Sequence, residues 1–338
     1  MKIPESDHNI QALIDKAHES KSEKPRPHLG ASTLGHACDR WLWLSFRWAV
    51  QPTFPGRILR LFRRGRMEEA TIAVDLKAIG IDIHSTEGAQ ARVDFGSHVS
   101  GSLDGIIESG VPGAPKARHI FEAKTHSKKS FDELARDGVE KAKPMHWCQM
   151  QVYMHGKGID RALYVAVCKD DDRIHSERIR YDEAAATALV ERGQRITMTE
   201  RMPEPCSGAG PDWYQCKFCA AYDFCHSTKL TQESNCRTCA HSTPTEDSRW
   251  TCARYDNIDI PPEIQPLGCP SHALHPDLVP WKMIGGKQWS AVYQIDGHEV
   301  VNGEDGFASS EIIANPSLCA NPDETTMALR QSFGARIC

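Results

Sequence analysis

Apolar and polar residues alternate along residues 119–124, in the order His-Ile-Phe-Glu-Ala-Lys. This alternation predicts a β-strand, because successive side chains on a strand point to opposite faces. Glu122 and Lys124 are therefore expected to share one face, while Phe121 and Ala123 point into a core on the other. The rest of the chain is interpreted around this strand.

A second strand is predicted over residues 99–107, with Asp104 near its middle. Residues 109–115, between the two strands, are rich in the glycine and proline that favour turns. Two strands joined in this way form a hairpin. The pattern therefore predicts that Asp104 lies beside Glu122.

Periodicity elsewhere predicts further elements on both sides of this hairpin. The predicted helices cover 9–20, 57–80, 147–154 and 182–202, with one more that begins at Ser32 or Thr33 and runs through Trp48. The predicted strands cover 162–168, 174–181, 289–295 and 298–301. This order of elements predicts an α/β core with a central mixed sheet flanked by helices. We interpret the tryptophans of the early helix as core residues.

The composition is that of a soluble globular protein, with 40% hydrophobic and 25% charged residues in 338. This length suits two or three domains. No apolar run is long enough to span a bilayer, and residues 1–7 contain no signal-peptide core, so we expect a cytoplasmic protein with no membrane partner. The net charge of −5 means that any binding of nucleic acid depends on a local basic patch.

One candidate for such a patch lies in the first half of the helix predicted over 57–80. Arginine at this density can bind phosphates through its forked guanidinium groups, although a solvated helix face is the alternative interpretation. Glu68 and Glu69 follow directly and favour the interpretation that the arginines bind phosphates. The arginines are Arg57, Arg60, Arg63, Arg64 and Arg66.

Carboxylates and an ammonium that converge at the predicted hairpin favour a divalent cation. Asp104 and Glu122 offer the hard oxygen ligands that Mg²⁺ or Mn²⁺ prefers. Lys124 beside them could orient or deprotonate a water, or stabilise developing charge. Burial near a metal would favour its neutral form, as a base requires. The alternative is a structural salt bridge between Lys124 and the carboxylates.

These residues resemble the PD-(D/E)XK nuclease superfamily, and most of all its RecB-like branch. That branch includes the nuclease domains of RecB and AddB, the CRISPR-associated RecB-like exonucleases and the lambda-type phage exonucleases. The resemblance covers roughly residues 29–228, and this chain lacks the proline that often precedes the aspartate. The motifs are Phe62-x2-Gly65-x3-Glu69, then Asp104, then Glu122-x-Lys124, then Gln149-x3-Tyr153.

The resemblance implies a restriction-endonuclease-like core and a role for each matching residue. Glu69, Asp104, Glu122 and the Ala123 carbonyl would hold Mg²⁺ or Mn²⁺. Gln149 and Tyr153 would position the DNA strand or a water. The implied catalytic residues are therefore Asp104, Glu122, Lys124, Gln149, Tyr153 and Glu69.

A first set of cysteines follows the predicted core in the spacing C-x2-C-x5-C, at Cys216, Cys219 and Cys225. Three thiolates at this spacing need a fourth ligand, and Cys38 is the candidate, with Cys206 as a substitute. One early and three late cysteines resemble the iron–sulfur staple of AddB and the CRISPR-associated exonucleases, which implies a [4Fe–4S] cluster. Zinc is the competing interpretation.

A second set has the layout C-x2-C-x12-C-x16-C and resembles a structural zinc site, formed by Cys236, Cys239, Cys252 and Cys269. His241, His272 and His275 are alternative ligands. The odd total of 13 cysteines also disfavours a disulfide framework. If the segment contacts DNA or a partner, its exposed basic and aromatic residues are expected to be Arg237, Arg249, Trp250 and Arg254.

The predicted domain organisation has four parts. They are an N-terminal helix and linker (1–28), a nuclease domain with the iron–sulfur staple (29–230), a small cysteine-rich module that binds zinc (231–280), and a C-terminal β-hairpin and tail (281–338).

The resemblance implies a Mg²⁺- or Mn²⁺-dependent DNA exonuclease of phage or mobile-element recombination and repair. Its partners would be DNA and a single-strand annealing or recombination protein, in the bacterial host cytoplasm if the gene is phage-borne. A structure-specific or single-strand endonuclease and a non-catalytic DNA-binding scaffold are the alternatives.

Overall fold

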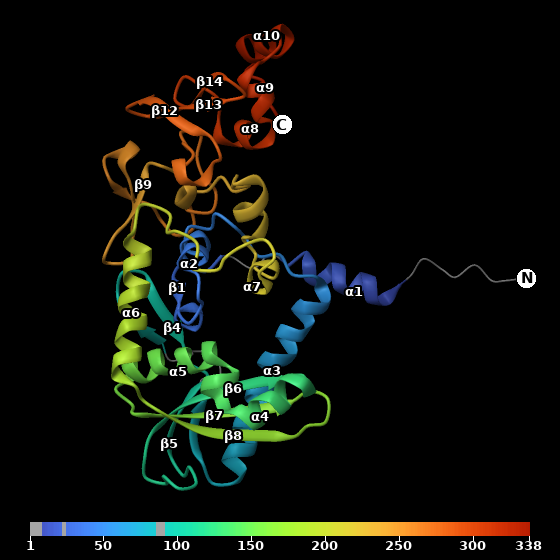
Figure 1. Cartoon of the computed structure of the whole chain (residues 1–338), viewed down its shortest axis with the longest axis vertical. Coiled ribbons are helices and arrows are strands. Elements are labelled where there is room, and N and C mark those ends of the chain that lie inside the picture. The colour runs from blue at the N-terminus through green and yellow to red at the C-terminus, as the bar shows by residue number, and fades with distance from the viewer. Residues whose placement is uncertain (1–8, 22–24, 86–91) are drawn as a thin grey trace, which may run out of the picture.

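The computed structural model describes residues 9–21, 25–85 and 92–338. Residues 1–8 and 22–24, which belong to the predicted N-terminal helix and linker, lie outside this description. The molecule is a mixed α/β protein with a five-stranded sheet near one end and a smaller three-stranded sheet near the other (Figure 1). None of the helices in the described part of the chain combines the length and apolar character that crossing a bilayer requires.

The five-stranded sheet has the order β2-β5-β6-β7-β8. Its strands are β2 (Asp82–Ser85), β5 (Gly105–Ser109), β6 (His119–His126), β7 (Arg161–Cys168) and β8 (Ile174–Arg180). β6 and β7 run parallel, and the other neighbouring pairs are antiparallel, so the sheet is mixed. The predicted strands at 119–124, 162–168 and 174–181 are confirmed.

Helices cover both faces of this sheet. One face packs against α3 (Gly56–Ala78), whose Ile72 and Ala73 share a buried cluster with Phe121 and Ala123 of β6. The other face, which carries Glu122, packs against α4 (Lys128–Ala142) and α5 (Pro144–Lys157). The predicted division of faces along β6 is confirmed.

Local signals explain where the flanking helices begin and end. α5 starts with a proline, whose missing N–H costs nothing there, and it ends at Gly158 in the left-handed conformation (φ 60°). α6 (Glu183–Met198) starts after Asp182, whose side chain accepts the N–H of Ala185. α6 falls within the predicted segment 182–202, whereas α5 extends beyond the predicted segment 147–154 at both ends.

The strand predicted over 99–107 is instead two strands in different sheets. β4 (Val99–Ser102) pairs with β1 (Leu29–Gly30) and β3 (Arg92–Asp94), whereas β5 belongs to the central sheet. Leu103 and Asp104 lie between them. Leu103 is fully buried in the main core, so the chain turns there from one sheet to the other and leaves Asp104 at the start of β5.

The early helix also differs from its prediction. Residues Ala31–Thr33 form one 3₁₀ turn, and α2 (Asp39–Phe46) begins only after Cys38, which is its N-cap. Neither Ser32 nor Thr33 caps it. Trp48 lies beyond the helix with a positive φ of 52°, yet both Trp43 and Trp48 are buried as predicted.

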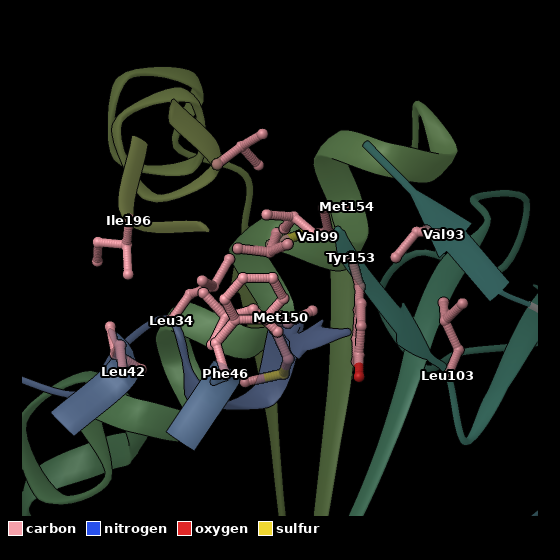
Figure 2. Packing of buried hydrophobic residues seen from close by; sticks show 14 of the residues in the cluster. Leu34, Leu42, Phe46, Val93, Val99, Leu103, Met150, Tyr153, Met154 and Ile196 are labelled. Carbon is pink, nitrogen blue, oxygen red and sulfur yellow. The ribbon is translucent and has the colours of Figure 1, made fainter. Parts of the chain in front are cut away.

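The main core joins α2, α5 and α6 to the β1-β4-β3 sheet. Figure 2 shows Leu34, Leu42, Met150, Tyr153 and Ile196 among its side chains. Trp250 and Leu278 belong to the same buried cluster. The core therefore runs across residue 231, where the sequence predicts a domain boundary.

The rest of the chain is built from short elements. α1 (Ile10–Glu19) packs on α3. The remaining elements are α7 (Tyr214–Lys217), β9 (Ser242–Pro244), β10 (Trp250–Cys252), β11 (Ile258–Asp259), β12 (Lys282–Lys287), β13 (Ser290–Ile295), β14 (His298–Gly303), α8 (Ser309–Ala314), α9 (Pro316–Ala320) and α10 (Glu324–Phe333). β13 and β14 form the predicted hairpin, and β12 adds a third strand that the sequence pattern did not indicate.

Candidate active site

The β5–β6 hairpin brings the two predicted carboxylates together. Gly105 pairs with Phe121 across the two antiparallel strands. Asp104, the residue before Gly105, therefore lies beside Glu122, the residue after Phe121. The Oδ2 atom of Asp104 accepts the backbone N–H of Ala123 at 3.0 Å. The prediction that Asp104 lies beside Glu122 is confirmed, although Asp104 precedes its strand.

Lys124 reaches back between these two carboxylates. Its Nζ atom donates to Oε1 of Glu122 and, at 3.1 Å, to the carbonyl oxygen of Ala123. The same Nζ lies 3.6 Å from Oδ2 of Asp104. The Glu122 side chain is fully buried, whereas 25% of the Lys124 side-chain surface is exposed to solvent. The ammonium is thus the positive partner of both carboxylates.

Charge and burial change the protonation of this group. Burial and the charge of Asp104 raise the pKa of Glu122 above its ordinary value. Burial lowers the pKa of Lys124, but Glu122 and Asp104 outweigh it and the pKa is raised. The two carboxylates thus favour the ammonium form of Lys124, whereas the neutral form is the one predicted beside a metal.

Glu69 joins the same electrostatic neighbourhood from α3. It is half-buried, and burial followed by the charge of Asp104 raises its pKa to about 7, while Lys124 and Arg66 oppose the shift. Gly65, one turn earlier, is close enough to β6 that a Cβ there would lie 3.9 Å from Oγ1 of Thr125. The motif predicted on this helix therefore faces the hairpin.

α5 supplies the last two predicted residues. Gln149 and Tyr153 are buried, and Nε2 of Gln149 lies 3.4 Å from the Tyr153 hydroxyl. Burial and then the charge of Glu122 raise the pKa of Tyr153, which places its hydroxyl near the carboxylates. The structure therefore brings the polar residues of the four motifs into one neighbourhood, namely Glu69, Asp104, Glu122, Lys124, Gln149 and Tyr153.

These residues offer suitable ligands for a divalent cation. Oε2 of Glu122 is buried without a hydrogen-bond partner, an arrangement that is costly unless something else occupies its lone pairs. Glu69 and Asp104 add carboxylates whose charges act on Glu122. Within the described residues, however, no three His, Cys, Asp or Glu side chains already form a metal-binding group. The Lys124 ammonium lies between the carboxylates instead.

The arginine patch lies along the first half of α3. Arg57, Arg63, Arg64 and Arg66 are exposed, and Arg60 is half-buried in an ion pair with Asp15 of α1 at 3.1 Å. Arg64 also donates to the carbonyl oxygen of Lys169 at 3.3 Å, and Arg66 acts electrostatically on Glu69. The patch therefore adjoins the carboxylates.

The first cysteine set converges around Cys38 at the start of α2. Burial raises the pKa of the Cys206 thiol, and its neighbours Cys38 and Cys216 raise it further. Burial raises the pKa of Cys219 and of Cys225. The charges of Cys38 and Cys216 raise the pKa of each of these two thiols further. Cys206 thus lies with the four predicted ligands.

The second cysteine set gathers around a tight turn. The N–H of Cys239 donates to the carbonyl oxygen of Cys236 at 3.2 Å, and the N–H of His241 donates to Sγ of Cys239 at 3.5 Å. Burial, followed for Cys236 by the charges of Cys269 and Cys252, raises the pKa of both Cys236 and Cys239. The four predicted ligands are therefore neighbours.

Two of the three histidines named as alternative ligands, His272 and His275, have other partners, whereas Nε2 of His241 is buried without a hydrogen-bond partner. Nε2 of His272 lies 3.0 Å from the carbonyl oxygen of Asn235, and its Nδ1 lies 2.7 Å from Oγ of Ser309. Nδ1 of His275 accepts the N–H of Asp277 at 3.1 Å. Both rings hold loops together.

The prediction that Arg237 and Trp250 are exposed is wrong. Both are buried, with 1% of their surface accessible. The Arg237 guanidinium lies 3.7 Å from the Trp48 ring centre and 5.1 Å from that of Trp250, and the Arg47 guanidinium lies 5.5 Å from the Trp250 ring centre. Stacked cation–π contacts bury these side chains, so they join the cysteine-rich segment to α2 rather than bind DNA.

The sequence pattern did not single out a group of aromatic side chains beside the carboxylates. His126 of β6, His146 of α5 and Tyr164 of β7 are joined by hydrogen bonds. The alternation along β6 gave one usable signal, because His126 falls on the same face as Glu122 and Lys124. Nothing in the sequence indicated that Tyr164 links the two histidines.

Comparison with known proteins gives only distant likenesses. No protein-family model matches the chain, and no curated protein matches it. Among solved structures, SSO0001 is 17% identical at a TM-score of 0.40, over 66% of this chain and 98% of that one. An alkaline exonuclease from Laribacter hongkongensis is 17% identical at a TM-score of 0.38, over 54% and 90%.

A phage-related exonuclease from Haemophilus somnus 129PT is 20% identical at a TM-score of 0.28, over 39% of this chain and 67% of that one. Likenesses of this size carry no argument about activity. The functional conclusion below therefore rests on the residues of this chain.

Proposed function

We propose that this chain is a Mg²⁺- or Mn²⁺-dependent deoxyribonuclease with a PD-(D/E)XK core. The observation that supports this most is the contact of Lys124 with both Glu122 and Asp104 at the centre of the mixed sheet. The buried, unpartnered Oε2 of Glu122 adds to it, because a metal ion would take up its lone pair. A salt bridge that served stability alone would not require that unpartnered atom.

Asp104, Glu122, Glu69 and the Ala123 carbonyl would hold the cation. When bound, the cation supplies the Lewis acid that polarises a phosphodiester and lowers the pKa of a water. Lys124 donates hydrogen bonds to the phosphate oxygens, on which negative charge develops during cleavage. Gln149 and Tyr153 orient the water or the strand from α5. The arginines of α3 hold the DNA backbone beside the carboxylates.

The finer proposal is an exonuclease that processes DNA ends in phage or mobile-element recombination, with a strand-annealing or recombination protein as its partner. The resemblance of the motifs supports this, and a single-strand or structure-specific endonuclease uses the same chemistry. The first cysteine set would carry a [4Fe–4S] cluster or zinc that closes the domain of residues 29–230. The second would carry zinc within the segment of residues 231–280. The C-terminal sheet and helices would complete the chain from residue 281.

The test is a digest of end-labelled single- and double-stranded DNA, with Mn²⁺ or with EDTA. The wild-type chain should cut only with Mn²⁺. Lys124→Gln should lower the rate on the order of 10²-fold or more, because a charge donor is removed from the transition state. The matched control is Lys128→Gln, which changes an exposed lysine at the start of α4. Equal rates for the two variants would contradict the proposal.

Anaerobic purification with iron, sulfide and zinc analysis tests the cysteine proposals separately. Iron and sulfide in the chain would support the cluster at Cys38, Cys216, Cys219 and Cys225. Two zinc ions and no iron would contradict it and leave zinc at both sets.

A further inference from the structure

A chain of hydrogen bonds runs across three elements beside the carboxylates. Nε2 of His126 and Nδ1 of His146 each lie 2.8 Å from the hydroxyl oxygen of Tyr164. Nδ1 of His126 lies 3.0 Å from Oγ of Ser130, at the start of α4. Tyr164 is fully buried and His126 nearly so, whereas His146 is half-buried. His146 is therefore the member of this hydrogen-bonded group that lies nearest the protein surface.

This group lies on the same side of the sheet as the proposed active site. Tyr164 of β7 pairs with Glu122 of β6, and on neighbouring strands paired side chains share a face. On α5, His146, Gln149 and Tyr153 are three and seven residues apart and so share one helix face. His146 therefore belongs to the helix face that already presents Gln149 to the carboxylates.

The surroundings of the two imidazoles are cationic. Burial, together with the charges of neighbours that include Lys124 and Lys143, lowers the pKa of His126 to about 4 and that of His146 to about 3. Both rings are therefore neutral near pH 7, and each carries one N–H. Lys124 is paired with Glu122 and Asp104, and Lys143 with Glu133. A neutral imidazole beside these ammonium groups can still donate its N–H to an anionic oxygen.

Proton counting restricts how the chain can be arranged. The Tyr164 hydroxyl has one proton, so it donates to one histidine and accepts from the other. If it donates to Nδ1 of His146, the remaining proton of that ring is on Nε2. The Nε2 atom of His146 has no hydrogen-bond partner among residues 9–21, 25–85 and 92–338. It is then a free donor at the edge of the carboxylate site.

We propose that His146 donates its Nε2–H to an oxygen of the DNA phosphodiester, and that Tyr164 and His126 are positioning residues that fix its tautomer and orientation. The inference rests on the proposed nuclease function and adds a substrate-binding residue to it. A donor held in place before the reaction stabilises the extra negative charge on the phosphate oxygens without reorganisation.

Two conservative substitutions separate this role from a purely structural one. The amide nitrogen of Gln occupies nearly the place of Nε2, and that of Asn nearly the place of Nδ1. His146→Gln should therefore keep much of the cleavage rate, whereas His146→Asn should lose on the order of 10²-fold in kcat with little change in KM. If His146 only ties α5 to β7, Asn should be the active variant and Gln the inactive one, which would overturn the proposal.

Tyr164→Phe tests the positioning part, because it removes the linking hydroxyl and keeps the ring. We expect kcat to fall roughly tenfold while the melting temperature and DNA affinity change little. The matched control is Tyr181→Phe, since Tyr181 makes a similar bond of 2.7 Å to His155 at the other end of α5. Equal kcat values for the two tyrosine variants would contradict the positioning role.

The outcomes distinguish this inference from the function on which it rests. If the wild-type chain does not cut DNA with Mn²⁺, both fail together. If the wild-type chain cuts, Lys124→Gln does not and both His146 variants cut like the wild type, the nuclease proposal stands and this inference is wrong.

Discussion

The carboxylate centre and the cysteine sets differ in how far the protein chain alone assembles them. Lys124 already contacts Glu122 and Asp104, and each of these groups changes the pKa of another. The cysteines of each set are also neighbours, and within the described residues neither they nor the carboxylates form a ready metal-binding group. The carboxylate centre is built around a hairpin of a packed sheet, whereas the cysteines lie on short helices and turns and on the short strand β10.

This difference reflects what fixes each backbone. Paired strands impose a register, so Gly105 opposite Phe121 determines where Asp104 meets Glu122. Loops carry no such register, and a thiolate site is commonly completed by its metal. The register can therefore fix where Asp104 and Glu122 lie relative to each other without an ion, whereas thiolate ligands on short segments are commonly brought together by their metal.

The largest expected effect comes from breaking the pre-formed centre at Asp104. Asp104→Asn keeps an oxygen that can accept the Ala123 N–H, but it removes the charge that a cation requires. Cleavage with Mn²⁺ should fall on the order of 10³-fold, with the melting temperature nearly unchanged. Glu108→Gln, at an exposed ion pair with Arg118, which directly precedes β6, is the control and should cut normally.

Breaking a cysteine set should act on stability instead of chemistry. Cys239→Ser should remove bound zinc and lower the free energy of unfolding by about 3 kcal/mol, because loops without their metal lose a cross-link. Zinc analysis and thermal unfolding measure the two effects. Cys338→Ser, at an exposed terminal thiol, should change neither. A Cys239→Ser chain with full zinc content would contradict the proposed ligand set.

His272 lies in the segment of the second cysteine set and holds its loops together while neutral. Its protonation therefore gives another test of that segment's stability. Burial lowers the pKa of His272 from 6.5 to about 4. As the pH falls below 6.5, the unfolded chain binds a proton that the folded chain does not. The stability from neutral His272 is therefore complete above pH 6.5 and is lost progressively as the pH falls toward 4, by about 3 kcal/mol.

His272→Gln isolates this contribution, since Gln can replace the Nε2 contacts and does not titrate. Thermal unfolding of the variant should depend less on pH between 6.5 and 4 than that of the wild type. Curves of equal slope for the two chains would show that other groups cause the acid sensitivity.

The smallest effect is expected at the arginine patch. Arg63→Gln should weaken DNA binding modestly and lower the slope of log affinity against log salt by about 1, because one phosphate contact is lost. The control is Arg180→Gln, which changes an exposed arginine at the end of β8. Identical salt slopes would remove α3 from the DNA-binding surface.

Strand alternation and motif order allowed much of this molecule to be predicted. The β5–β6 hairpin, the two faces of β6 and the segments of α3, α5 and α6 all follow from local pattern. The division of 99–107 into two strands does not, because it depends on Leu103 entering a core built from distant elements. The burial of Arg237 and Trp250 escaped prediction for the same reason, since their partners Trp48 and Arg47 are far away in the sequence.

The candidate site shows the same limit. The acids and the lysine were found because chemistry and spacing coincide within one hairpin. Tyr164 and His146 were not found, because only the register of β6 and β7 and the packing of α5 bring them together. Contacts set by tertiary packing have no signature in one sequence.

The central claim is that Glu122 is the buried ligand of a metal that cuts DNA. The most direct measurement is the Mn²⁺ dependence of end-labelled DNA cleavage by the wild type and by Glu122→Gln, a change that preserves shape and removes one buried charge. The account predicts cleavage that saturates with Mn²⁺ in the wild type and a rate lower on the order of 10³-fold in a folded, DNA-binding variant. Cleavage by Glu122→Gln at the wild-type rate and with the wild-type Mn²⁺ dependence would contradict it.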